Sequence, residues 1–77
     1  MKATVVSPEK TLFSGEVESV AVPGESGRFE ILQNHAPIIS GLTAGTVVCK
    51  AAEQFSIEIK GGFVEVARNE VSVCVEL

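Results

Sequence analysis

Short runs in which apolar and polar residues alternate are the feature that most limits what this 77-residue chain can fold into. In the run 54–60, Phe55, Ile57 and Ile59 alternate with polar residues. In the run 71–77 the apolar positions are Val71, Val73, Val75 and Leu77. A side-chain period of two indicates a strand with one buried face, and no segment has the spacing of an amphipathic helix. The sequence therefore predicts an all-β fold.

Turn residues separate these runs at short, regular intervals. The turn signals are Ser7-Pro8-Glu9, Ser14-Gly15, Pro23 to Gly27, Gln33-Asn34, Ala44-Gly45, Glu53, Gly61-Gly62 and Arg68-Asn69. The last two each predict a tight hairpin, because Gly and Asn reach the positive φ of primed turns. About nine to ten short strands in one open sheet would leave an apolar face uncovered. We therefore predict one domain over residues 1–77, a two-layer β-sandwich or flattened barrel.

Composition and charge argue against several classes of partner. The chain has ten acidic residues, all Glu, and six Lys or Arg, for a net charge of −4. Without a basic cluster it is a poor candidate for binding nucleic acid or anionic lipid, where Lys and Arg supply much of the affinity. No apolar run approaches the ~20 residues of a membrane-spanning helix. The first residues resemble no signal peptide, so we expect the chain in a cytosol or an equivalent compartment.

The sequence predicts no catalytic residues, no cofactor and no metal site. His35 could pair with Cys49 or Cys74 in a thiol enzyme, but no motif surrounds these residues. They also lack the paired spacing of a zinc site. In a reducing compartment we expect the two Cys as free thiols in or near the core. A disulfide would require the strands to bring them within bonding range.

Three other local patterns each have a structural explanation and a functional alternative. Glu16 and Glu18 would point to one face of a strand, where charges that prevent edge aggregation are favoured over an acid–base pair. Gly24-Glu25-Ser26-Gly27 lacks the spacing of a phosphate-binding loop and predicts a surface turn. Lys60, next to a predicted hairpin, could carry lipoyl or biotin as in small carrier domains, but the residues on either side of it do not match that motif.

Several segments, in order and with natural spacing, resemble the epsilon subunits of F-type ATP synthases. They are 7–20 with Phe13-Ser14-Gly15, 23–40 with His35-Ala36-Pro37, 41–47, Gly61-Gly62-Phe63-Val64-Glu65-Val66, and 69–73. His-Ala-Pro together with Gly-Gly-x-x-Glu-Val at this separation is a specific combination. The resemblance implies the β-sandwich domain of that subunit, a non-catalytic part of the central stalk. In that role it would connect the gamma subunit to the membrane c-ring and couple proton flow to ATP synthesis.

The resemblance also implies partner-facing residues and a location. The loop Gly24 to Glu30 would face the c-ring through Glu25, Arg28, Phe29 and Glu30. The gamma-facing residues would be His35, Ile38, Ser40 and Phe63. For His35, hydrogen bonding that fixes the turn before Pro37 is the structural alternative. Contact with the membrane would be indirect, through the complex, at the cytoplasmic face of the bacterial inner membrane.

The chain departs from the family pattern at a few positions. Glu30 stands where Gly is usual, and Gln33-Asn34 where Pro-Gly is usual. Asn34 is expected to keep the left-handed turn, because Asn tolerates positive φ. Nothing matches the two C-terminal helices of the family, so we predict no nucleotide site and no helix-based inhibition in this chain.

Overall fold

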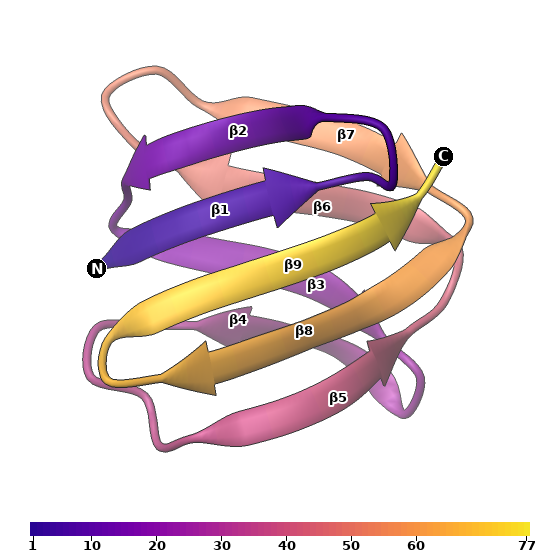
Figure 1. Cartoon of the computed structure of the whole chain (residues 1–77). Helices are drawn as coiled ribbons and strands as arrows, with labels where there is room; N and C mark the ends of the chain where they lie inside the picture. The colour runs from indigo at the N-terminus through magenta and orange to yellow at the C-terminus, as the bar shows by residue number, and fades with distance from the viewer.

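The computed structural model describes residues 1–77 and contains nine strands (Figure 1). It has no helix, and therefore none that could cross a membrane. The strands are β1 Lys2–Val6, β2 Thr11–Glu16, β3 Ser19–Gly24, β4 Gly27–Ile31, β5 Ile38–Leu42, β6 Gly45–Lys50, β7 Phe55–Ile59, β8 Gly61–Ala67 and β9 Glu70–Glu76. The all-β prediction is confirmed, as is the expected number of strands.

The strands form two layers that lie face to face in Figure 1. The first layer has the order β2-β1-β9-β8-β5, and the second has the order β4-β3-β6-β7. The layers join at one corner, where Gly24 of β3 pairs with Leu42 of β5. All neighbouring strands are antiparallel except β1 and β9, which run parallel. The result is the predicted two-layer sandwich, close to a flattened barrel.

The space between the layers is filled mainly by valine. Stiff β-branched side chains pack well on pleated strands, and alternation sends every second one inward. The core consists of Met1, Ala3, Val5, Val17, Val20, Val22, Ile31, Leu42, Val47, Cys49, Ile59, Val64, Val66, Val71, Val73 and Val75. The edge strands β2 and β7 are not paired with each other. The rings of Phe13 on β2 and Phe55 on β7 pack between them, with centroids 5.1 Å apart. No buried side-chain nitrogen or oxygen lacks a hydrogen-bond partner.

Two of the predicted turns form as the sequence indicates. Arg68 and Asn69 join β8 to β9 with φ of 52° and 61°. Positive φ at both central residues defines a type I′ turn, whose twist matches that of the flanking strands. Asn34 has φ of 59°, so it does supply the left-handed conformation expected of it.

The hairpin predicted at Gly61-Gly62 is wrong. β7 pairs with β6, whereas β8 pairs with β5 and β9, so Lys60 carries the chain from the second layer to the first. The glycine is required for a different reason. Gly62 has φ of +143°, and a Cβ there would lie 2.0 Å from the carbonyl oxygen of Cys74 on β9. Leu77 was also expected to share the inner face of β9, but it follows that strand and is half exposed.

Candidate functional site

The segment predicted to face the c-ring is a hairpin rather than a loop. Glu25 and Ser26 form its two-residue turn, and Arg28, Phe29 and Glu30 lie within β4. The expectation of an exposed loop over those three residues is therefore wrong. Alternation along the strand separates them, because Arg28 and Glu30 point outward while Phe29 is half buried against the core.

The absence of a side chain at Gly24 leaves room for the Phe29 ring. A Cβ on Gly24 would lie 2.8 Å from the Phe29 ring carbon Cε1. The ring thus covers the end of β3 and contributes to the core instead of projecting toward a partner. Its role in contacting the c-ring stays a prediction, and the geometry offers only part of its surface for that role.

Arg28 has a structural partner of its own. Its Nη1 donates a hydrogen bond of 2.6 Å to the backbone carbonyl oxygen of Thr46 on β6. The β3–β6 register pairs Ala21 with Val48, so continuing it by two residues would place Pro23 opposite Thr46. Proline has no N–H to donate into the ladder. The guanidinium reaches across β3 and supplies a donor at the point where the backbone has none.

Glu25 is also engaged within the chain. Its backbone N–H donates to the carbonyl oxygen of Gly41 at 3.1 Å, and its carboxylate lies against the Gly41 backbone where a Cβ would otherwise sit. The side chain of Glu30 is exposed and forms no hydrogen bond or ion pair. The exposed Glu30 carboxylate is therefore free for a partner.

The four residues predicted to face gamma do not share one surface. Ile38 pairs with Val66 and Ser40 with Val64. Both valines are buried, so the side chains of Ile38 and Ser40 also point toward the inner side of the first layer. Phe63 points to the outer side and is 49% exposed. The outer residue of β5 is Ile39, which is 75% exposed. Ile39 was not among the residues predicted to contact a partner.

The outer side of the first layer carries a continuous apolar row. Cross-strand pairing places Gly41, Phe63, Cys74 and Val6 side by side on β5, β8, β9 and β1. Next to Phe63 and Cys74 is an open hollow of about 320 Å³ whose lining extends to Pro8 and Glu76. Phe63 and Cys74 are direct cross-strand partners in this row. We call Gly41, Phe63, Cys74 and Val6, together with Ile39, the outer apolar face.

His35 lies in the connection between β4 and β5 and is half buried. Its Nδ1 is 2.7 Å from the carbonyl oxygen of Ala36, and its backbone N–H donates to Leu32 at 3.2 Å. Since a carbonyl oxygen only accepts, Nδ1 carries the hydrogen. These contacts are those of a residue that fixes the loop before Pro37. A contact between His35 and a partner stays a prediction.

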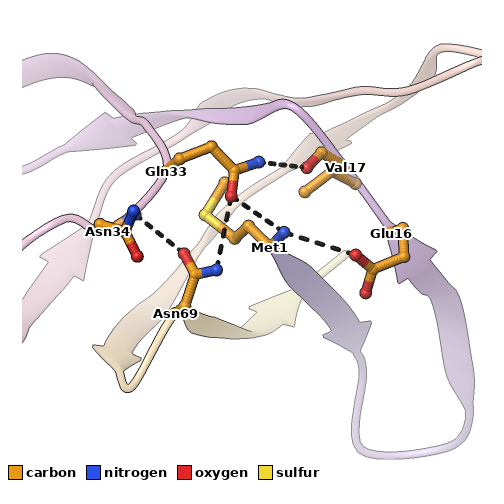
Figure 2. A network of polar contacts seen from close by, with 6 residues as sticks. All are labelled: Met1, Glu16, Val17, Gln33, Asn34 and Asn69. Carbon is orange, nitrogen blue, oxygen red and sulfur yellow. Dashed lines mark hydrogen bonds and ion pairs between the residues drawn. The ribbon is translucent and has the colours of Figure 1, made fainter.

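The same connection is held by a polar network that begins in the β8–β9 turn (Figure 2). The side-chain oxygen of Asn69 accepts a hydrogen bond of 2.9 Å from the backbone N–H of Asn34. The side-chain nitrogen of Asn69 donates to the Gln33 amide oxygen at 3.4 Å, and Gln33 in turn donates to the Val17 carbonyl at 3.0 Å. The amino group of Met1 also donates to Gln33, at 3.0 Å. Gln33 and Asn34, the two residues that stand where the family usually has Pro-Gly, thus both form hydrogen bonds in this network.

The remaining candidate sites are separated in space. Cys49 is fully buried, and that burial raises its pKa from 9.0 to about 11, so the thiol holds its proton at neutral pH. Cys74 lies on the outer apolar face. Both thiols are free, and neither is a polar contact of His35. No group of three or more His, Cys, Asp or Glu side chains gathers as a metal site would require.

Two further expectations need correction. Lys60 lies in the crossover between the layers, not at a hairpin tip where a carrier lysine would be found. Glu16 ends the edge strand β2, but Glu18 follows it in the connection to β3, so the two do not share a strand face. Glu16 is 81% exposed, as expected for an edge charge.

The chain is similar to known proteins over its whole length. Residues 1–77 match the family described as ATP synthase, Delta/Epsilon chain, beta-sandwich domain. The chain belongs to this family. Among its relatives, the ATP synthase epsilon chain of Leptospira interrogans is 42% identical over 99% of this chain. The epsilon chain of Chlorobium limicola is 40% identical over 97%. The chain spans 61% of the Leptospira relative and 88% of the Chlorobium one.

Two solved structures show the same fold at low sequence identity. A chain of the Euglena gracilis mitochondrial ATP synthase, solved as OSCP/F1/c-ring, superposes with a TM-score of 0.86 at 18% identity. It covers 95% of this chain and 48% of the Euglena one. A chain of the Tetrahymena thermophila central stalk and c-ring superposes with a TM-score of 0.83 at 17% identity, over 100% of this chain and 63% of that one.

Proposed function

We propose that this chain is the β-sandwich part of a non-catalytic stalk subunit of an F-type ATP synthase, connecting the gamma subunit to the membrane c-ring. The observation that carries the proposal is the family match over residues 1–77, with relatives named as ATP synthase epsilon chains. Coupling of proton flow to ATP synthesis would then be the work of the whole complex. The location would be peripheral, at the cytoplasmic face of a bacterial inner membrane.

The architecture supports a mechanical role. A connector has to hold two partner surfaces in a fixed relation, and a closely packed core resists deformation. Here the ten largest side chains with less than 2% exposure fill the interior, and eight of them are valine. The outer apolar face exposes the side chains of Ile39 and Phe63, which suits a long-lived contact with gamma. The β3–β4 turn and Glu30 would contribute the c-ring contact.

The first experiment tests the partners. A tagged chain is added to detergent-solubilised membranes of its source organism, and captured proteins are identified by mass spectrometry. We expect gamma and c subunits among them. Capture should weaken in Phe63→Ser, which alters the outer apolar face, but not in Leu77→Ser, which changes a similarly exposed residue outside the strands. Recovery of no ATP synthase subunit by the unaltered chain would refute the proposal.

A second experiment tests the c-ring contact separately. Glu30→Lys reverses a charge that has no partner within the chain, and Glu53→Lys does the same in the exposed segment between β6 and β7. We expect Glu30→Lys to reduce ATP-driven proton pumping in membrane vesicles while both variants keep their folding stability. Equal pumping by the two variants would remove Glu30 from the c-ring contact without affecting family membership.

A further inference from the structure

The β4–β5 connection, residues 32–37, is held by few contacts of its own. It contains the exposed Ala36 and Pro37 and lies between strands of opposite layers. Its internal backbone bond is the 3.2 Å contact from His35 to Leu32. A short segment with one such bond would sample several conformations, because each unrestrained residue keeps ~1–2 kcal/mol of backbone entropy. Something outside the segment has to fix it.

Two side chains supply that restraint from different directions. Asn69, which is 35 residues away along the chain, accepts the Asn34 N–H at 2.9 Å. Gln33 bonds to Val17 on one side and to Asn69 on the other (Figure 2). Asn69 is itself rigid, because it occupies the second position of the type I′ turn and its carbonyl accepts the Lys2 N–H at 3.3 Å.

We infer that Asn69 is a positioning residue whose side chain sets the conformation of the 32–37 segment and so the presentation of His35 to the gamma subunit. The second half of this inference rests on the proposed function, whereas the first half concerns the chain alone. Asn69 is neither in the connection nor on the outer apolar face. Asn69 would therefore affect gamma binding only through the 32–37 segment that it positions.

The turn offers well-matched variants. Asn69→Gly keeps the positive φ but removes both side-chain bonds, since Gly is at least as favourable as Asn at that position. Arg68→Gly makes the same change one residue earlier, where the side chain has no part in the network. Asn69→Asp keeps an oxygen that can accept the Asn34 N–H and should restore the conformation.

The first measurement is amide hydrogen exchange of the isotopically labelled chain by NMR. In Asn69→Gly we expect exchange of the Asn34 amide to accelerate roughly fivefold, which corresponds to the ~1 kcal/mol that a hydrogen bond typically contributes. Arg68→Gly and Asn69→Asp should leave it within about twofold of the unaltered chain. Unchanged Asn34 exchange in Asn69→Gly would overturn the positioning role whatever the partner.

The second measurement is affinity for the recombinant gamma subunit of the same organism. We expect Asn69→Gly to bind several-fold more weakly while staying folded at the assay temperature, and Asn69→Asp to recover most of the loss. Faster Asn34 exchange with unchanged gamma affinity would refute the link between this segment and gamma. If the unaltered chain does not bind gamma at all, the proposed function fails, while the exchange result still decides the positioning role.

Discussion

Replacing Gly62 by Ala should be the most damaging glycine substitution in this chain. Gly62 combines φ of +143° with a backbone that lies directly against β9. An added Cβ would be 2.0 Å from the Cys74 carbonyl oxygen and 3.0 Å from the Val75 Cα. These are backbone atoms of a paired strand, so they cannot move aside as a flexible side chain would.

The expected cost follows from two separate effects. A non-glycine residue at such a φ costs ~1–3 kcal/mol, and forcing extra volume into a packed region costs a further ~1–3 kcal/mol. Added together, they lower the free energy of unfolding by about 2–6 kcal/mol. A chain of this length has a total of about 4–12 kcal/mol. Gly62→Ala should therefore be marginally folded or unfolded.

Two other glycines separate the contributions. Gly27 has φ of +130° with no atom near the Cβ position, so Gly27→Ala reports the backbone effect alone, ~1–2 kcal/mol. At Gly61 no positive φ is needed, and the nearest atom is the Leu42 carbonyl oxygen at 3.6 Å. Gly61→Ala should stay within ~0.5 kcal/mol of the unaltered chain, or gain slightly.

The assay is urea unfolding followed by far-UV circular dichroism, because the chain has no Trp or Tyr for fluorescence. The expected order of stability is Gly61→Ala above Gly27→Ala above Gly62→Ala. A Gly62→Ala variant no less stable than Gly27→Ala would show that β9 does not lie where the structure places it. It would also reopen a hairpin at this glycine pair.

Two other substitutions test single interactions. The pKa of Cys49 is raised to about 11, so between pH 9 and 11 the folded chain keeps a proton that the unfolded chain loses. The free energy of unfolding should therefore fall across that window by about 2–3 kcal/mol. Urea unfolding of Cys49→Ala should show a smaller fall, and an equal fall would count against the burial argument. Arg28→Met should cost ~1 kcal/mol through the lost bond to Thr46. Pro23→Ala, which restores a backbone N–H, should reduce that cost in the double variant, whereas strict additivity would exclude the proline explanation.

The strands were predictable from the sequence because their signal is local. Alternation in the runs 54–60 and 71–77 and the positive φ of Asn34 and Asn69 depend only on neighbours in the chain. Strand pairing does not. A Gly-Gly pair signals positive φ, but that φ serves a hairpin in one context and a close strand approach in another. The crossover at Lys60 was missed for this reason.

The face of each predicted site residue was less predictable than its strand. Alternation states that Ile38 and Ile39 point opposite ways, but only pairing with Val66 and Glu65 states which one points inward. The resemblance placed Ile38 among the gamma-facing residues, and the exposed residue is Ile39. Family patterns locate positions along the chain, whereas contacts such as that of Arg28 with Thr46 depend on which strands lie side by side.

The two proposed partner surfaces belong to different layers, so a connector depends on how firmly those layers are joined. The outer apolar face is on the first layer, and the β3–β4 turn is on the second. Besides the shared core, backbone hydrogen bonds join the layers at one corner, where Glu25 donates to Gly41 at 3.1 Å and Thr43 donates to Pro23 at 2.8 Å. Gly41 permits this approach, because a Cβ there would displace the Glu25 carboxylate. Glu25 belongs to the β3–β4 turn and Gly41 to the outer apolar face, so this corner links the two proposed partner surfaces directly. If the chain transmits torque between two partners, loosening this corner should weaken the transmission.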